Sequence, residues 1–214
     1  MRAVLLRCGV VGLLLLLGAA DPVRASGPLV PACGAPSRGK LLVAARQLRG
    51  GGFAESVILL VEHGSGGSMG LIVNRPSPMK LSEVLPSHDD VKERGDDLWV
   101  GGPVQPTRLM LLARAPERLL DGRPVFGEVQ LIQTRRGLSH AFGIGIPSAA
   151  LRAYAGYSGW AAGQLDDEIA RGDWHVVDAE APAVFSQEPR ALWGELIDGV
   201  AGRWVERPSA HAPT

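Results

Sequence analysis

Short apolar runs separated by glycine-rich or polar segments dominate the chain between residues 39 and 76. Three of these runs, at residues 41–45, 57–61 and 71–73, consist of aliphatic side chains. Runs of this length bounded by turn residues predict buried strands. Residues 62–69 link the second run to the third, and this link has the length of a hairpin loop. Its glycines take positive φ angles without steric cost, so the pattern predicts a β-hairpin.

Further extended segments follow along the chain. Each is an apolar run bounded by glycine, proline or charged residues, and the last alanine-rich one leads into the glycine turn at Gly156. The strands predicted from these segments are residues 98–101, 108–113, 125–134 and 148–154. Residues 174–177, near the C-terminus, are predicted to form a further strand. Arg135 and Arg136 are expected to form a small basic turn.

Prolines organise the region after the hairpin. Pro76 and Pro78 are expected to end the strand, and residues 77–85 then carry leucine and valine at helical spacing. Pro86 is expected to end that short helix. The charged residues 87–97 are expected to form a solvated loop or a frayed helix.

Two helices are predicted near the C-terminus. Residues 164–171 carry acidic side chains in their first turns and are followed by Gly172, a natural helix stop. Residues 188–197 present leucine, tryptophan and isoleucine on one face. Since strands dominate the first half and helices are interspersed later, we expect one α+β, or mixed α/β, domain.

The N-terminus has the features of a secretory signal peptide. Arg2 and Arg7 precede an apolar segment at residues 10–20, and a small-residue site ends at Ala25. The apolar segment is shorter than the roughly 20 residues of a membrane-spanning helix, so no such helix is expected in the mature chain. We expect cleavage after Ala25 and export to the periplasm or the medium. The alternatives are a cytoplasmic protein and one anchored to the membrane by an uncleaved N-terminus.

The expected organisation is a signal peptide at residues 1–25, a flexible leader at 26–38, a folded domain at 39–200 and a tail at 201–214. Cleavage leaves Cys33 as the single cysteine of the mature chain, which excludes an internal disulfide. A lipoprotein, the alternative, would be modified at Cys33.

Composition limits the classes of partner. The chain is 46% hydrophobic and 21% charged, which is typical of a soluble globular protein. Its 22 basic and 22 acidic residues cancel, so the whole molecule has no electrostatic drive towards nucleic acid. We therefore expect a small ligand or a protein partner rather than nucleic acid.

Two serine patterns suggest nucleophilic chemistry at first sight. Residues 66–70 fit the G-x-S-x-G pattern of a hydrolase, but a strand follows Ser68 where a nucleophile elbow requires a helix. Ser56 and His63 form a second possible pair, yet no residue that orients the histidine is evident. A structural role is favoured for both, and no catalytic residue is predicted.

Metal and cofactor motifs are equally weak. The five histidines have no short-range ligand spacing, and the acidic cluster around His88 and Asp89 is typical of surface. The glycines at residues 50–52 lack the Lys-Ser/Thr that follows a phosphate-binding loop. No metal and no cofactor is predicted.

Three stretches of the chain resemble the YqgE/AlgH family. The first spans residues 39–76 and matches at Gly39, Leu41, Leu42, Phe53, Ser56, Val57, Glu62, His63, Met69, Gly70, Leu71, Asn74, Arg75 and Pro76. The second is Gly-Gly-Pro-Val at residues 101–104, and the third is GYSGWAAGQLDDE at residues 156–168. The resemblance covers residues 39–197 and implies a bulged, coiled, mainly antiparallel or mixed sheet surrounded by helices. It implies no particular reaction.

The sequence departs from the family pattern in the first stretch. Glycines at residues 50–52 stand where the family usually has Asp-Pro, and Glu55 replaces a frequent arginine. Family members also commonly carry alanine where Ser68 stands, which argues against a shared nucleophile at that position.

The resemblance also singles out polar and aromatic residues that core packing does not require. If the turns after the central strands converge, Arg75 binds an anion and two aromatic rings form a stacking wall. The alternative is that Arg75 braces a turn and Trp160 belongs to the core. The candidate cleft consists of Glu62, His63, Asn74, Arg75, Tyr157, Trp160 and Gln164.

The preferred hypothesis is therefore a non-enzymatic protein that binds a small ligand or a protein partner. A transcriptional regulator, a label that the family carries, is the alternative. Three features of this chain count against that alternative: its neutral net charge, its expected signal peptide and the lack of a recognisable helix-turn-helix. An enzyme of unknown class is the third hypothesis.

Overall fold

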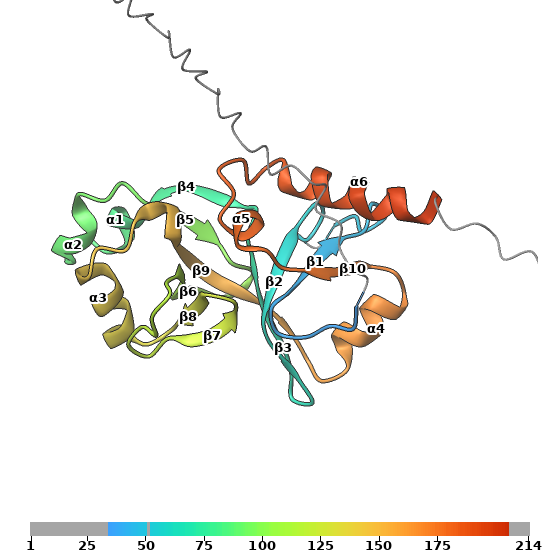
Figure 1. Ribbon diagram of the computed structural model, residues 1–214, viewed down its shortest axis with the longest axis horizontal. Coiled ribbons are helices and arrows are strands. Elements are labelled where there is room, and N and C mark those ends of the chain that lie inside the picture. Colours follow the sequence, from blue (N-terminus) through green and yellow to red (C-terminus); the bar gives the residue numbers. More distant parts are fainter. Residues whose placement is uncertain (1–33, 51, 206–214) are drawn as a thin grey trace, which may run out of the picture.

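The computed structural model describes residues 34–50 and 52–205, and a sheet of ten strands is its centre (Figure 1). The strands are β1 (Lys40–Ala44), β2 (Val57–Gly64), β3 (Gly67–Ile72), β4 (Pro76–Lys80), β5 (Asp97–Val100), β6 (Val104–Arg114), β7 (Arg123–Phe126), β8 (Val129–Ile132), β9 (Leu151–Trp160) and β10 (Trp174–Asp178). The expected signal peptide and the leader up to residue 33 lie outside the described residues, as does the tail from residue 206.

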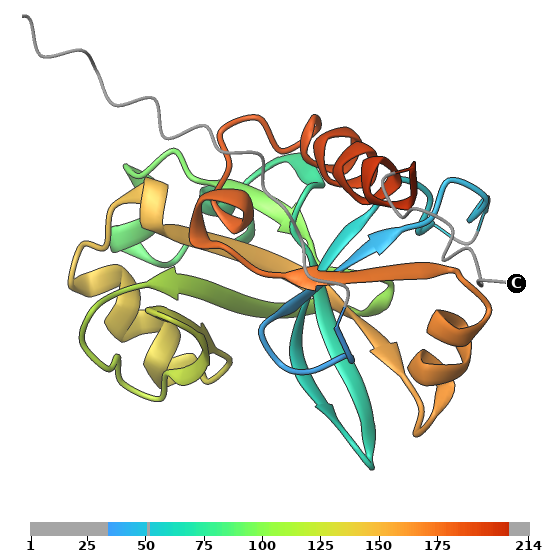
Figure 2. The ribbon, with the colours of Figure 1, turned by 45° about the vertical axis from the view of Figure 1, so that its right-hand side comes forward.

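The sheet runs in the order β10-β1-β2-β3-β9-β6-β8-β7, with β5 paired to β4 and β9. Every strand pair is antiparallel except β5 with β9. Strand β9 joins the two halves, because its first part lies between β5 and β6 and its end pairs with β3. Figure 2 shows the curl of the sheet around this long strand. The α+β class and the coiled, bulged, mainly antiparallel sheet are thus confirmed.

Helices cover the sheet and fill its ends. They are α1 (Leu81–Val84), α2 (Asp89–Lys92), α3 (Arg135–Gly143), α4 (Gln164–Ala170), α5 (Ala181–Val184) and α6 (Leu192–Val205), with the 3-10 turn η1 (Ser148–Ala150) before β9. Helix α6 lies against β1, where the Trp193 indole donates a hydrogen bond to the Ala44 carbonyl at 2.8 Å. No described helix is long and apolar enough to cross a membrane.

The continuous apolar runs of β1 and β2 are explained by burial on both faces of the sheet. Leu41 and Val43 pack into one cluster with the buried face of α6, whereas Leu42 and Ala44 pack into another with Leu165 of α4. Strands covered on both faces need apolar residues at successive positions rather than at alternate ones.

Strand β4 corrects the expected helix at residues 77–85. Pro76 pairs with Trp99 and Lys80 with Asp97, so only residues 81–84 are helical. Prolines are compatible with an edge strand because the missing amide hydrogens face away from the partner. The helical spacing of apolar residues therefore predicted a helix wrongly for residues 77–80, which belong to β4.

Several other boundaries differ from the expected ones. The strand expected at residues 148–154 begins only at Leu151, after the 3-10 turn η1. The segment 125–134 is a hairpin, β7 and β8, with Gly127 at a φ of 46° in its turn. Arg135 begins α3 rather than a turn, since the Thr134 hydroxyl caps that helix by accepting from the Gly137 amide at 3.0 Å. The final helix begins at Leu192 rather than at residue 188 and runs to Val205.

His175 of β10 provides a pH-dependent term in stability. Burial lowers the pKa of His175 from 6.5, because charge on the half-buried ring is disfavoured. The unfolded chain therefore binds more protons than the folded one as pH falls below about 6.5, and stability decreases in that range. We expect His175→Gln to reduce the loss of unfolding free energy between neutral and mildly acidic pH, measured by urea titration. An equal loss in both proteins would contradict the assignment.

Candidate functional site

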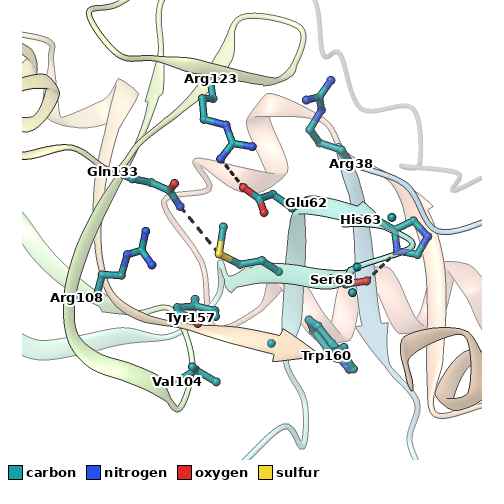
Figure 3. Close-up of a pocket in the computed structure, with 15 residues that line it drawn as sticks. Arg38, Glu62, His63, Ser68, Val104, Arg108, Arg123, Gln133, Tyr157 and Trp160 are labelled. Atoms are coloured by element: carbon teal, nitrogen blue, oxygen red, sulfur yellow. Dashed lines mark hydrogen bonds and ion pairs between the residues drawn. The ribbon is translucent and has the colours of Figure 1, made fainter. Parts of the chain in front are cut away.

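A pocket of about 1110 Å³ opens beside the β2–β3 hairpin (Figure 3). Its walls come from segments far apart in the sequence: Arg38 ahead of β1, the ends of β2 and β9, the start of β3, and parts of β6, β7 and the segment after β8. Besides four glycines, its lining residues are Arg38, Glu62, His63, Ser68, Met69, Val104, Arg108, Arg123, Gln133, Tyr157 and Trp160.

The sheet geometry explains why polar groups gather here. A bulge between Leu60 and Glu62 interrupts the β2–β3 register, and beyond it the strands leave the buried core. The hairpin is longer than expected, because both strands continue to Gly64 and Gly67. At the other side, Gly39 lies so close to β7 that an added Cβ would approach the Phe126 Cβ to 2.9 Å. This close approach brings Arg38 to the same pocket as Arg123.

The pocket holds more positive than negative charge. Glu62 forms an ion pair with Arg123, and it is the single carboxylate among the lining residues. Arg108 lies over the Tyr157 ring at 5.9 Å and contacts the Gln105 side chain at 3.3 Å. Arg38 has no hydrogen-bond or ion-pair partner within the described ranges. A chain with no net charge thus concentrates three guanidinium groups in one place.

His63 and Ser68 face each other across the hairpin, with 2.8 Å between Nδ1 and Oγ. Ser56 does not pair with His63, in line with the structural role expected for it, because Ser56 is fully buried and donates to the Phe53 carbonyl at 2.7 Å. Ser68 lies inside β3, with strand on both sides, so the G-x-S-x-G pattern does not form a nucleophile elbow. In the described part of the chain no carboxylate or carbonyl orients the second ring nitrogen of His63.

The floor of the pocket is less polar. The Gln133 amide lies 3.3 Å from the Met110 sulfur and 4.0 Å from the sulfur of Met69, which lines the pocket. Tyr157 and Trp160 form the aromatic side of the same space. No group of three metal-ligating side chains is found in the described residues.

Four of the seven predicted cleft residues line this pocket: Glu62, His63, Tyr157 and Trp160. Trp160 is only 7% exposed, and its indole donates to Glu168 at 2.8 Å. It therefore belongs to the core while one edge contributes to the pocket.

The other three predicted residues hold turns together and do not line the pocket. Asn74 accepts from the Val57 amide and donates to the Glu55 carbonyl, both at 2.9 Å. Arg75 donates to the Gly52 and Ala54 carbonyls. Gln164 accepts from the Ala161 amide at 3.0 Å and so closes the turn before α4. Arg75 thus takes the turn-holding position that the sequence left open as an alternative, and the arginines that line the pocket are Arg38, Arg108 and Arg123.

Sequence reasoning missed Arg38, Arg108, Arg123 and Gln133. Each is an ordinary polar residue beside a strand, and nothing local distinguishes it from other surface arginines or glutamines. Their convergence depends on the pairing of β9 with both β3 and β6, which the apolar pattern does not specify.

Comparison with known proteins places the chain in a family. The AlgH-like family model, DUF179, matches residues 41–204. A UPF0301 protein of Streptomyces avermitilis is 35% identical over 168 residues, covering 74% of this chain and 84% of that protein. A UPF0301 protein of Chlorobium limicola is 31% identical over 176 residues, covering 82% of this chain and 91% of that protein.

Two solved structures share the fold. The solution structure of the AlgH protein from Pseudomonas aeruginosa has a TM-score of 0.61 and 28% identity, covering 83% of this chain and 95% of that one. The crystal structure of protein DIP2367 from Corynebacterium diphtheriae has a TM-score of 0.67 and 24% identity, covering 84% and 91%. Since the family model and the relatives span most of the domain, the chain belongs to the AlgH-like family.

Proposed function

We propose that this AlgH-like protein binds a small organic anion in the pocket beside the β2–β3 hairpin and does not transform it. The observation that carries the proposal is the gathering of Arg38, Arg108 and Arg123 around a pocket with one carboxylate, in a chain of zero net charge. Guanidinium groups bind carboxylate and phosphate oxygens through paired, charge-assisted hydrogen bonds.

The surroundings of the arginines support an anion with a planar part. Glu62 holds Arg123, and Gln105 with the Tyr157 ring holds Arg108, so less side-chain freedom is lost on binding. The Tyr157 ring and the Trp160 edge offer an apolar surface beside the charges. The volume of about 1110 Å³ is slightly above the roughly 300–1,000 Å³ of most small-molecule sites.

A thermal-shift screen of organic anions tests this proposal. An anion at 100 times its dissociation constant adds about 2.7 kcal/mol to the apparent unfolding free energy. We expect aromatic carboxylates or phosphates to give such a shift, and the double variant Arg108→Ala/Arg123→Ala to lose it. Arg118→Ala removes an exposed arginine outside the pocket and is the matched control.

Failure of every anion in the parent, or an undiminished shift in the double variant, would refute the proposed site. The same variants address the alternative function. Binding of random-sequence duplex DNA at low salt, weakened by both arginine substitutions and by added salt, would favour a transcriptional regulator instead.

We also propose export of the protein, on the basis of the charged and apolar N-terminal pattern. The expected mature N-terminus is at Ser26, and the expected location is the osmotic-shock fraction. Intact mass and cell fractionation measure both. A cytosolic protein that retains Met1 would contradict export and strengthen the regulator alternative.

A further inference from the structure

A second pocket of about 310 Å³ shares no lining residue with the first. It lies between β4, β5, the start of β9 and the segment after α5, which meet near the top of Figure 1. Trp99, Leu151 and Pro189 supply apolar wall, and the charged lining residues are Arg94, Asp96, Asp97 and Arg152.

Arg152 is the most unusual of these charges. The residue is only 6% exposed, and its guanidinium group stacks on the Trp99 ring, 3.8 Å from the ring centroid. It donates to the Val73 and Ser186 carbonyls, which are neutral acceptors. No carboxylate within the described residues pairs with it. A buried cation without a counter-charge is costly, so an anion at this place is strongly favoured.

Both acidic residues of the pocket already have a cationic partner. Asp97 pairs with Lys80, and one oxygen of Asp96 pairs with Arg94, which also donates to the Ile146 carbonyl at 2.8 Å. The Asp96 side chain is 7% exposed, and its other oxygen, Oδ1, is buried without a hydrogen-bond partner in the described structure. The pocket therefore presents one cation that lacks an anion and one carboxylate oxygen that lacks a donor.

We propose that this pocket binds a free α-amino acid with an apolar side chain. The ligand carboxylate pairs with Arg152, the ammonium donates to Asp96, and the side chain packs against Trp99 and Leu151. A zwitterion complements both unmatched groups and leaves the net charge of the pocket unchanged. The volume is at the lower end of the range for small-molecule sites, which excludes large ligands.

Calorimetric titration with leucine and two close analogues tests the assignment. We expect leucine to bind. The affinity for 4-methylpentanoate, which lacks the ammonium, should be lower by about tenfold or more. Isoamylamine, which lacks the carboxylate, should give no measurable heat. Asp96→Asn should lower the affinity for leucine and leave that for 4-methylpentanoate nearly unchanged.

A blocking variant avoids the risk that Arg152 substitutions unfold the protein. Ala149 is exposed and lines the pocket, so Ala149→Trp should abolish leucine binding, whereas Ala170→Trp on the exposed side of α4 should not. The Arg108→Ala/Arg123→Ala variant should bind leucine normally, which separates this site from the first pocket. Absence of leucine binding to the parent at millimolar concentration, or equal binding by Ala149→Trp, would overturn the proposal.

Discussion

Replacement of Gly102 by alanine is expected to remove a large part of the free energy of unfolding. Gly102 has a φ of 153°, and an added Cβ would lie 2.3 Å from the Tyr157 carbonyl carbon and 2.4 Å from the Ser158 nitrogen. These are backbone atoms of β9, so no rotamer change relieves the overlap. Gly156 of β9 is in the reciprocal position, since its Cβ would lie 2.5 Å from the Gly102 carbonyl oxygen.

The expected cost exceeds about 4 kcal/mol, because overpacking and an unfavourable φ for alanine act together. That is a large part of the roughly 5–15 kcal/mol that stabilises a typical domain. Far-ultraviolet circular dichroism and urea titration measure it.

Two further glycine variants separate clash from backbone strain. Gly66 has no positive φ and no atom within 4 Å of its Cβ position, so Gly66→Ala should change stability by less than about 0.5 kcal/mol. Gly163 has a φ of 76° in open space, and Gly163→Ala should cost about 1 kcal/mol from strain alone. A Gly102→Ala protein no less stable than Gly163→Ala would show that β9 moves aside easily.

The crossing at Gly102 also shapes the anion pocket. Val104, two residues after Gly102, pairs with Tyr157 of β9, and both residues line that pocket. The Gly-Gly-Pro-Val turn is thus a place where a local sequence pattern reports a long-range contact.

Much of the framework was predictable because it depends on local patterns. The aliphatic runs of β1 and β2 and the acidic start and glycine stop of α4 all specify their elements within a few residues. Strand β4 was missed because an edge strand tolerates prolines that the interior of a sheet does not.

The site was less predictable because its charges come from distant segments. Arg38, Arg108 and Arg123 converge only after β9 has paired with β3 and β6 and after Gly39 has packed against β7. Arg75 seemed the better candidate because it lies in a family motif. Its hydrogen bonds to two loop carbonyls instead explain its place in that motif.

Glu168→Ala is expected to cost about 3 kcal/mol of unfolding free energy. The Glu168 carboxylate accepts from the indoles of Trp160 and Trp174 at 2.8 Å each and from the Gln164 amide at 3.0 Å. Both tryptophans are less than a tenth exposed, so alanine leaves two buried N–H donors without an acceptor, each costing about 1–3 kcal/mol.

Comparison with Glu168→Gln isolates the role of the acceptor oxygen. Glutamine keeps one oxygen that accepts from the indoles and removes the charge, so its cost should be about 1 kcal/mol. Asp167→Ala, at an exposed position of the same helix, should stay within about 0.5 kcal/mol. Urea titration followed by tryptophan fluorescence measures all three. Since Trp160 also borders the anion pocket, Glu168→Ala should weaken anion binding as well as the fold. Equal stabilities for all three variants would show that the indoles find other acceptors.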